Sequence, residues 1–133
     1  GSILDGITVL VVDDNEFNRI VAGDILQSKA DLNIVEAVNG QEAFDLMKTT
    51  HFDVILMDVQ MPVLNGYLAT KKIRTELKEP KCNTPIIALT ASVLQEDIDH
   101  CKEAGMDSYI AKPFKPEHLI TEIAKALNIE LRT

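Results

Sequence analysis

Three aspartates stand where short apolar runs of the sequence end. Asp13 and Asp14 follow the run 9–12, and Asp58 follows the run 54–57. Removing a carboxylate from water at the end of a buried strand costs several kcal/mol unless the group is paired or bound to a cation. Oxygen ligands without clustered histidines or cysteines favour a hard cation, and Mg²⁺ takes one or two carboxylates while keeping several waters. The three side chains are therefore candidate ligands of Mg²⁺ or Mn²⁺.

Two further polar residues end apolar runs of the same kind. Thr90 follows the run 86–89, and Lys112 follows the run 108–111. A hydroxyl and an ammonium group beside a metal site can stabilise the oxygens of a transferring phosphoryl group. A carboxylate in such a site can serve as the nucleophile. The set of residue types is that of a phosphoryl-transfer site.

Simpler interpretations of the same residues stay open at this point. Asp13 and Asp14 could cap a helix that starts near residue 16, because aspartate is a preferred N-cap residue. Asp58 could begin a turn, and the threonine and lysine could merely end a strand and carry a solvated charge. A lone tyrosine in a strand, such as Tyr109, usually packs against the core. Only the coincidence of all these residues at one edge of a sheet argues against the simpler interpretations.

Short apolar runs alternate five times with amphipathic stretches of helical period. The runs are rich in Val and Ile and are bounded by turn residues, which predicts strands over 7–12, 34–38, 53–57, 85–89 and 108–111. Apolar residues at helical spacing lie between and after these runs, and the first such face comprises Phe17, Ile20, Val21 and Ile25. Regular alternation predicts an α/β fold with one parallel sheet covered by helices on both faces. In such sheets ligands bind beyond the carboxyl ends of the strands, where the polar residues gather.

Helix start and stop signals agree with this alternation. Asn39 with Glu42, and Ser92 with Gln95, have the spacing of a capping box. Pro116 suits the first position of the last helix, and Gly105 is a plausible stop for the helix before it.

Composition bounds the possible functions. The chain has 133 residues, 46% of them hydrophobic and 26% charged, which predicts one globular domain over residues 3–133. The net charge of −8 argues against direct contact with nucleic acid or anionic lipid. The sequence has neither a run long enough to span a membrane nor a signal peptide, so a cytoplasmic location is expected. Gly1 and Ser2 resemble the scar of a cleaved expression tag.

Four motifs carry a resemblance to the receiver domain of two-component response regulators, over residues 8–127. They are Val11-Val12-Asp13-Asp14-Asn15, Met57-Asp58-Val59-Gln60-Met61-Pro62 with Asn65-Gly66, Leu89-Thr90-Ala91 and Tyr109-Ile110-Ala111-Lys112-Pro113-Phe114. Each motif is weak alone, but together and in order they are specific. The resemblance implies a flavodoxin-like (βα)5 fold with strand order 2-1-3-4-5.

The resemblance also implies roles for individual residues. Asp58 would accept a phosphoryl group from a phosphohistidine. Asp13, Asp14, Asp58 and the main-chain carbonyl of Gln60 would hold Mg²⁺. Lys112 would pair with a phosphoryl oxygen.

The remaining roles concern the response to phosphorylation. Thr90 would close onto the phosphoryl group, and Tyr109 would turn inward as the aromatic switch residue. The Lys112–Pro113 peptide bond would be cis. The surface of the fourth helix, fifth strand and fifth helix would change shape. Such a domain catalyses its own phosphorylation and dephosphorylation and is not a dedicated turnover enzyme.

Two other function classes share parts of this pattern. An Mg²⁺-dependent aspartyl phosphohydrolase would need a second aspartate two positions after the nucleophile, where this chain has Gln60. A flavodoxin-like cofactor binder would need backbone amides and small residues after the first strand. The segment Asp13-Asp14-Asn15-Glu16 would instead repel a phosphate.

The sequence also predicts a context for the receiver. The segments 14–19 and 84–91 resemble the receivers of hybrid histidine kinases, with a stand-alone regulator as the alternative. The expected partners are a histidine kinase or a histidine phosphotransfer domain, and a phosphorylation-dependent dimer is a further expectation.

Overall fold

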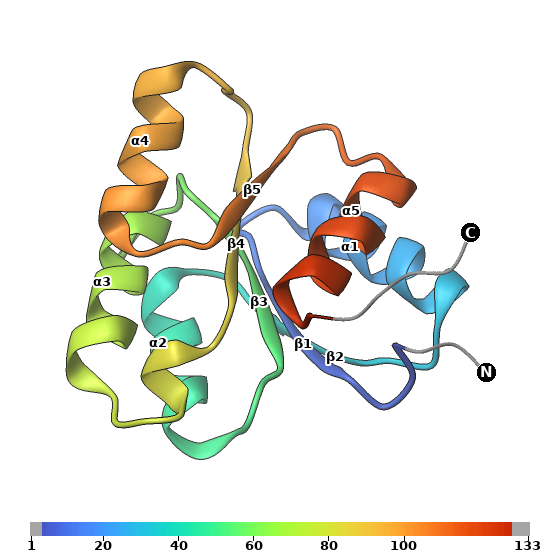
Figure 1. Cartoon of the computed structure of the whole chain (residues 1–133), viewed down its shortest axis with the longest axis horizontal. Helices are drawn as coiled ribbons and strands as arrows, with labels where there is room; N and C mark the ends of the chain where they lie inside the picture. The colour runs from blue at the N-terminus through green and yellow to red at the C-terminus, as the bar shows by residue number, and fades with distance from the viewer. Residues whose placement is uncertain (1–3, 129–133) are drawn as a thin grey trace.

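The computed structural model describes residues 4–128, so the predicted tag scar at Gly1 and Ser2 lies outside the described residues. Strands and helices alternate along the chain (Figure 1). The strands are β1 (Thr8–Val12), β2 (Asn33–Ala37), β3 (Val54–Asp58), β4 (Ile86–Thr90) and β5 (Ser108–Ala111). The helices are α1 (Glu16–Lys29), α2 (Gly40–Thr49), α3 (Gly66–Glu76), the short 3-10 helix η1 (Lys81–Asn83), α4 (Gln95–Ala104) and α5 (Pro116–Ala126).

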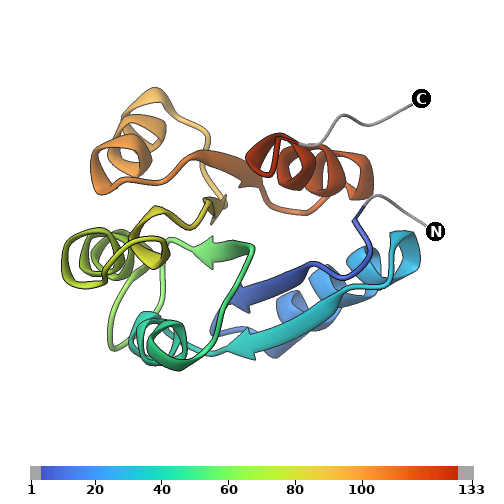
Figure 2. The same ribbon diagram turned by 60° about the horizontal axis from the view of Figure 1, so that its bottom comes forward.

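All strand pairs are parallel, and the order in the sheet is β2-β1-β3-β4-β5. Both the predicted fold class and the predicted strand order are therefore confirmed. Helices α2, α3 and α4 lie on one face of the sheet and α1 and α5 on the other, which the turned view makes clear (Figure 2). No helix among residues 4–128 has the length and apolar composition needed to cross a membrane.

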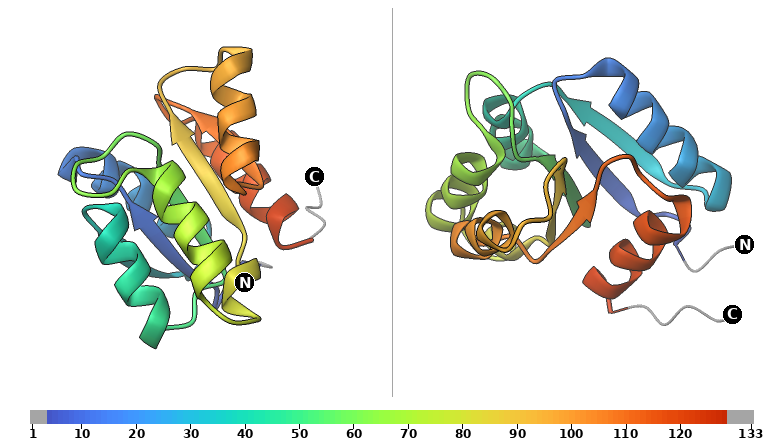
Figure 3. Two further views of the ribbon diagram at one scale, coloured as in Figure 1. Left: turned by 90° about the vertical axis from the view of Figure 1, so that its left-hand side faces the viewer. Right: turned by 90° about the horizontal axis from the view of Figure 1, so that it is seen from above.

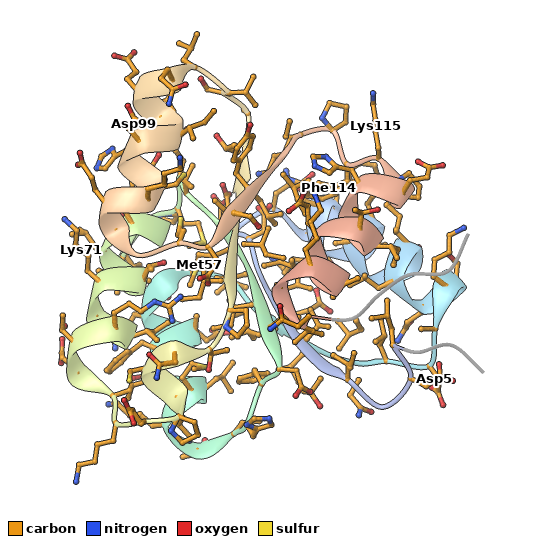
Figure 4. All side chains as sticks on the ribbon, in the orientation of Figure 1. Asp5, Met57, Lys71, Asp99, Phe114 and Lys115 are labelled. Atoms are coloured by element: carbon orange, nitrogen blue, oxygen red, sulfur yellow. The ribbon has the colours of Figure 1, made fainter. Side chains whose placement is uncertain are left out.

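The alternation of side chains along the strands builds two cores. Leu10, Ile55 and Met57 pack in the core beneath α2, α3 and α4, and Figure 4 shows Met57 in the interior of the molecule. Val9 and Leu56 point to the opposite face and pack with residues of α1 and α5. Because both faces are covered, β1, β3 and β4 are apolar almost throughout, as central parallel strands are.

The helix signals were confirmed in three cases and wrong in one. Asn39 caps α2 by accepting from the Glu42 amide at 2.8 Å. Pro116 is the first residue of α5, and Gly105 ends α4 with a left-handed φ of 101°. Ser92 does not cap α4, because the helix starts later, at Gln95, with Leu94 at its N-cap position and no side-chain cap.

The predicted apolar face of α1 is covered only in part, because Ile25 packs against the core while other residues of that face lie at the surface. The residues of α1 that are buried are Ala22 and Leu26, whereas Phe17 is 71% and Ile20 is 49% exposed. A helix face is buried only where the sheet or a neighbouring helix covers it, and periodicity alone does not locate that cover. Two large apolar side chains thus lie at the surface near the start of α1.

A half-buried guanidinium ties together the loops at the amino edge of β4 and β5. Arg74, on α3, donates to the carbonyl oxygens of Gly105, Cys82 and Thr84 at 3.0, 2.9 and 2.7 Å. Its Nη2 lies 3.0 Å from Asp107 Oδ2, which also accepts from the Ile86 amide. Burial lowers the pKa of Arg74, and the Asp107 carboxylate opposes that effect. We call Arg74, Asp107 and these carbonyl groups the arginine centre.

Candidate functional site

The carboxyl ends of four adjacent strands bring the predicted site residues together. In the register of the sheet, Val12 of β1 lies beside Met57 of β3, and Asp58 lies beside Leu89 of β4. Asp13 directly follows β1, whereas Asp58 is the last residue of β3. The view from above in Figure 3 looks onto this edge of the sheet. Thr90 ends β4 and Lys112 follows β5, so both lie at the same edge.

Three carboxylates converge at this edge. One oxygen from each of Asp13, Asp14 and Asp58 lies within 4.8 Å of the others. Asp13 is 1% and Asp58 is 5% exposed, while Asp14 is open to solvent. The prediction that these three side chains lie together is confirmed, although strand position alone did not show that only Asp14 faces the solvent.

Lys112 lies between the two buried carboxylates. Its Nζ is 3.1 Å from Asp13 Oδ2 and 3.4 Å from Asp58 Oδ2. Burial raises the pKa of Asp58 to about 6, the Asp13 carboxylate adds to this rise, and Lys112 only partly offsets it. One ammonium group thus pairs with two of the three clustered carboxylates, and the cluster keeps an excess of negative charge. We call Asp13, Asp14, Asp58 and Lys112 the aspartate centre.

Backbone groups fix the two buried carboxylates. Asp13 Oδ1 accepts from the Asn15 amide at 2.9 Å, and Asp58 Oδ1 accepts from the Gln60 amide at 3.2 Å. Arg19 donates to the main-chain oxygen of Asp13 at 2.8 Å and forms an ion pair with a glutamate of the edge strand β2. These contacts hold one oxygen of each carboxylate and leave the others directed at the cluster.

The helix-capping interpretation of Asp13 and Asp14 is wrong. The N-cap of α1 is Asn15, whose side chain accepts from the Asn18 amide at 3.1 Å. The two aspartates therefore precede the cap, and capping does not explain their position.

Gly66 sets the distance between α3 and the backbone of the acidic site. Its amide donates to the Val59 carbonyl at 3.2 Å. A Cβ atom at this position would lie 2.2 Å from the main-chain oxygen of Asp58, so no other residue fits without moving the backbone. The glycine of the Asn65-Gly66 motif thus supports the position of Asp58.

The two residues predicted to respond to phosphorylation lie in different surroundings, and of these two only Thr90 lines the pocket over the cluster. Thr90 is 5% exposed, and its hydroxyl is engaged by the main chain of Ser92. Tyr109 is half-buried against the core and lines a pocket of about 260 Å³ with residues of α4 and α5. The Lys112–Pro113 peptide bond is cis, as the resemblance implied.

A pocket of about 270 Å³ opens over the aspartate centre. Its lining includes Gln60, whose side chain is exposed, and three residues that were not predicted: Asn18, Tyr67 and Asp97. Tyr67 stacks on His100 of α4 with ring centroids 4.0 Å apart. The sequence offered one usable signal, because Tyr67 directly follows the glycine that packs on Asp58.

The donor set fits a hard divalent cation. The three clustered groups are all carboxylates, which favour Mg²⁺ over softer metals. Burial and the Asp13 carboxylate raise the pKa of Asp58 despite the nearby Lys112, so the charged form of Asp58 would gain from further compensation. A cation beside the carboxylates would supply it.

Comparison with known proteins agrees with this geometry. Residues 9–124 match the family described as the response regulator receiver domain. Among curated proteins, histidine kinase 3 of Arabidopsis thaliana is 35% identical over 147 residues, which cover 96% of this chain and 14% of that protein. The osmosensing histidine protein kinase SLN1 of Saccharomyces cerevisiae is 40% identical over 120 residues, 86% of this chain and 10% of that protein. The chain thus spans only a small part of these relatives.

Solved structures share the whole architecture. The receiver domain of a sensor histidine kinase from Pseudomonas aeruginosa, with a magnesium ion coordinated in its active-site cleft, is 38% identical, with a TM-score of 0.84 over 92% of this chain and 98% of that one. The receiver domain of the response regulator Ssk1, in complex with the histidine phosphotransfer protein Ypd1 of Saccharomyces cerevisiae, is 32% identical, with a TM-score of 0.80 over 90% and 87%. The chain belongs to the response regulator receiver domain family.

Proposed function

We propose that Asp58 is the phosphoacceptor of this receiver domain and that it takes a phosphoryl group from a phosphohistidine. A carboxylate oxygen of Asp58 attacks phosphorus, the phosphorus–nitrogen bond breaks, and its electron pair stays on the imidazole. The observation that carries the proposal is the contact between Lys112 Nζ and Asp58 Oδ2 at 3.4 Å inside a cluster of three carboxylates. An acyl phosphate formed there would have an ammonium group beside its oxygens.

Asp13, Asp14 and Asp58 would hold Mg²⁺ together with the main-chain carbonyl of Gln60. The bound ion would offset the charge of the attacking carboxylate and of the transferring phosphoryl oxygens. The chain's own part is to hold Asp58 through the Gln60 amide and to keep Lys112 between the two buried carboxylates.

Phosphorylation would then act as a switch. It adds about 1.5 to 2 negative charges and strong acceptor oxygens, which favour the arrangement in which Thr90 and Lys112 approach the phosphoryl group. Tyr109 lines the pocket between α4 and α5, so its movement would alter the surface of α4, β5 and α5. The domain can move between two states only by as much as phosphorylation favours one of them.

The partner that fits is a histidine phosphotransfer domain or the histidine-bearing domain of a kinase. The donor must approach the carboxyl edge of the sheet, where α1 begins with Asn18 in the pocket wall and Phe17 and Ile20 at the surface. We propose that these two apolar side chains contact the donor.

A receiver module of a hybrid histidine kinase is the favoured context, because the similar curated proteins include histidine kinases of which the chain covers a small share.

The test is phosphorylation by acetyl phosphate in Mg²⁺, followed by intact-mass measurement. The wild-type chain should gain one phosphoryl group, and Asp58→Asn should gain none. Asp45→Asn, a change at an exposed carboxylate of α2, is the matched control and should behave like the wild type. Equal phosphorylation of the wild type and Asp58→Asn would refute the proposal.

A second variant tests the role of Lys112. Lys112→Ala should keep the fold but separate phosphorylation from the response of Tyr109. NMR chemical shifts of Tyr109 that still change with phosphate as in the wild type would contradict this role.

A further inference from the structure

The hydroxyl of Thr90 is held by the loop that follows β4. Thr90 Oγ1 donates to the main-chain oxygen of Ser92 at 2.9 Å and accepts from the Ser92 amide at 3.1 Å. A hydroxyl has a single proton to donate. While that proton is bound by Ser92, Thr90 has none to offer a phosphoryl oxygen on Asp58.

Ser92 is itself tied to α4. Its Oγ donates to Asp97 Oδ2 at 2.5 Å and accepts from the Leu94 amide at 3.4 Å. A hydrogen bond of this length from a hydroxyl to a carboxylate is strong and charge-assisted. Asp97 is half-buried in the first turn of α4 and lines the pocket over the aspartate centre. A continuous chain of contacts therefore runs from Thr90 through Ser92 to Asp97.

We propose that Asp97 is a positioning residue that, through Ser92, holds the Thr90 hydroxyl in its resting place. We call the chain of contacts from Thr90 through Ser92 to Asp97 the tether. The tether sets how readily Thr90 closes over a phosphoryl group. This inference rests on the proposed function of Asp58. Closure must break the bond from Thr90 to the Ser92 carbonyl, and a loop fastened to α4 resists the displacement that would break it. Cutting the tether therefore shifts the population toward the closed state and strengthens binding of a phosphoryl mimic.

The charge of Asp97 could produce a similar effect by a different route. A carboxylate in the pocket wall repels an anion, so removing it would strengthen binding even without a tether. Ser92→Ala separates the two explanations, because it removes the hydroxyl that binds Asp97 and leaves the charge in place. It also keeps the main-chain groups that bind Thr90.

The experiment is an NMR titration of the chain with beryllium fluoride in saturating Mg²⁺, followed at the Thr90 amide. Ser92→Ala and Asp97→Ala should each lower the dissociation constant by about 3- to 10-fold, the range of one hydrogen bond. The double variant should bind no more tightly than the tighter single variant, because one tether is lost in all three. Asp97→Asn should fall between the wild type and Asp97→Ala, because an amide oxygen still accepts from Ser92.

Asp99→Asn is the matched control. It removes a carboxylate from the same helix, where Asp99 (labelled in Figure 4) is exposed and accepts from Gln95 at 2.8 Å. This variant should bind the mimic like the wild type. Unchanged or weaker binding by Ser92→Ala, or additive effects in the double variant, would refute the tether and leave charge as the only role of Asp97.

A second measurement judges the tether without any ligand. Three-bond couplings to the Thr90 methyl carbon report its side-chain rotamer in the free protein. The rotamer populations should change in Ser92→Ala and Asp97→Ala but not in Asp99→Asn, and unchanged populations in all variants would refute the tether. Failure of the wild type to bind beryllium fluoride would instead refute the proposed function, and the couplings would still decide the tether.

Discussion

The arginine centre and the aspartate centre both place charge inside the molecule but differ in how that charge is compensated. Arg74 makes four hydrogen bonds, three to main-chain oxygens and one to Asp107. In the aspartate centre, Lys112 is the one cation of residues 4–128 that pairs with Asp13 and Asp58, and the pKa of Asp58 is raised to about 6. The charge of Arg74, which supports the fold, is matched by hydrogen-bond partners. The negative charge of the aspartate centre is only partly offset, so this centre can still bind a cation.

The largest expected effect is the loss of the arginine centre. Arg74→Ala should lower the free energy of unfolding by about 3 kcal/mol, because it removes three hydrogen bonds to carbonyl groups and the ion pair with Asp107. Urea unfolding followed by circular dichroism measures this change. Lys71→Ala, at an exposed position of the same helix (Figure 4), is the control and should change stability by less than about 0.5 kcal/mol. If Arg74→Ala were as stable as Lys71→Ala, the arginine centre would not stabilise the fold and would not differ from the aspartate centre in this respect.

A change in the aspartate centre should have the opposite sign. Without Mg²⁺ at neutral pH, Asp58→Asn should raise the free energy of unfolding by about 1–3 kcal/mol, because it removes a buried carboxylate whose charged form is disfavoured. Urea unfolding in a chelator measures this gain. Adding Mg²⁺ should stabilise the wild type more than the variant, and a destabilised variant in chelator would show that Asp58 is fully compensated by Lys112.

The stability that Asp58→Asn gains over the wild type should depend on pH in a defined direction. A carboxyl group whose pKa is raised on folding, here from 3.8 to about 6, favours the folded state below pH 4 and loses that contribution as the pH rises through 6. The stability difference between Asp58→Asn and the wild type should therefore be greatest above pH 7 and shrink toward pH 4. Unfolding curves of both proteins in chelator across this range test the expectation, and a difference that grows on acidification would contradict it.

The smallest effect on stability is expected at the surface next to the aspartate centre. Phe17→Ala should change the free energy of unfolding by less than about 0.5 kcal/mol, because the side chain is 71% exposed. It should weaken binding of a histidine phosphotransfer domain by about 1–2 kcal/mol, as loss of an aromatic contact does. Phosphorylation by acetyl phosphate should be unchanged. If Phe17→Ala slowed phosphorylation by acetyl phosphate as much as phosphorylation by the histidine phosphotransfer domain, Phe17 would act on the aspartate centre and not on binding of the partner.

Local sequence signals predicted the elements well but not their contacts. The five strands were found to within one residue at each end, because their short Val- and Ile-rich runs are bounded by turn residues. Ser92 was expected to pair with Gln95 and instead binds Asp97. The hydroxyl can serve a cap or a nearby side chain, and only the start of α4 at Gln95 decides between them.

The acidic site was predictable for a geometric reason. Parallel strands have their carboxyl ends at one edge, so Asp13, Asp58, Thr90 and Lys112 had to meet if the strands were neighbours. The tyrosine and aspartate of the pocket wall, Tyr67 and Asp97, were not predictable in this way. They lie on helices, where the direction of a side chain depends on how the helix is seated on the sheet.

The sequence by itself determined the alternation of strands and helices and the carboxylates at the strand ends. Only the tertiary structure decided which face of α1 is buried, how Lys112 divides its contacts, and which carbonyl groups Arg74 binds. The physical reason is that periodicity and turn chemistry act between near neighbours in the chain. Burial and charge compensation depend instead on groups such as Arg74 and Asp107 that are far apart in sequence and meet only after folding.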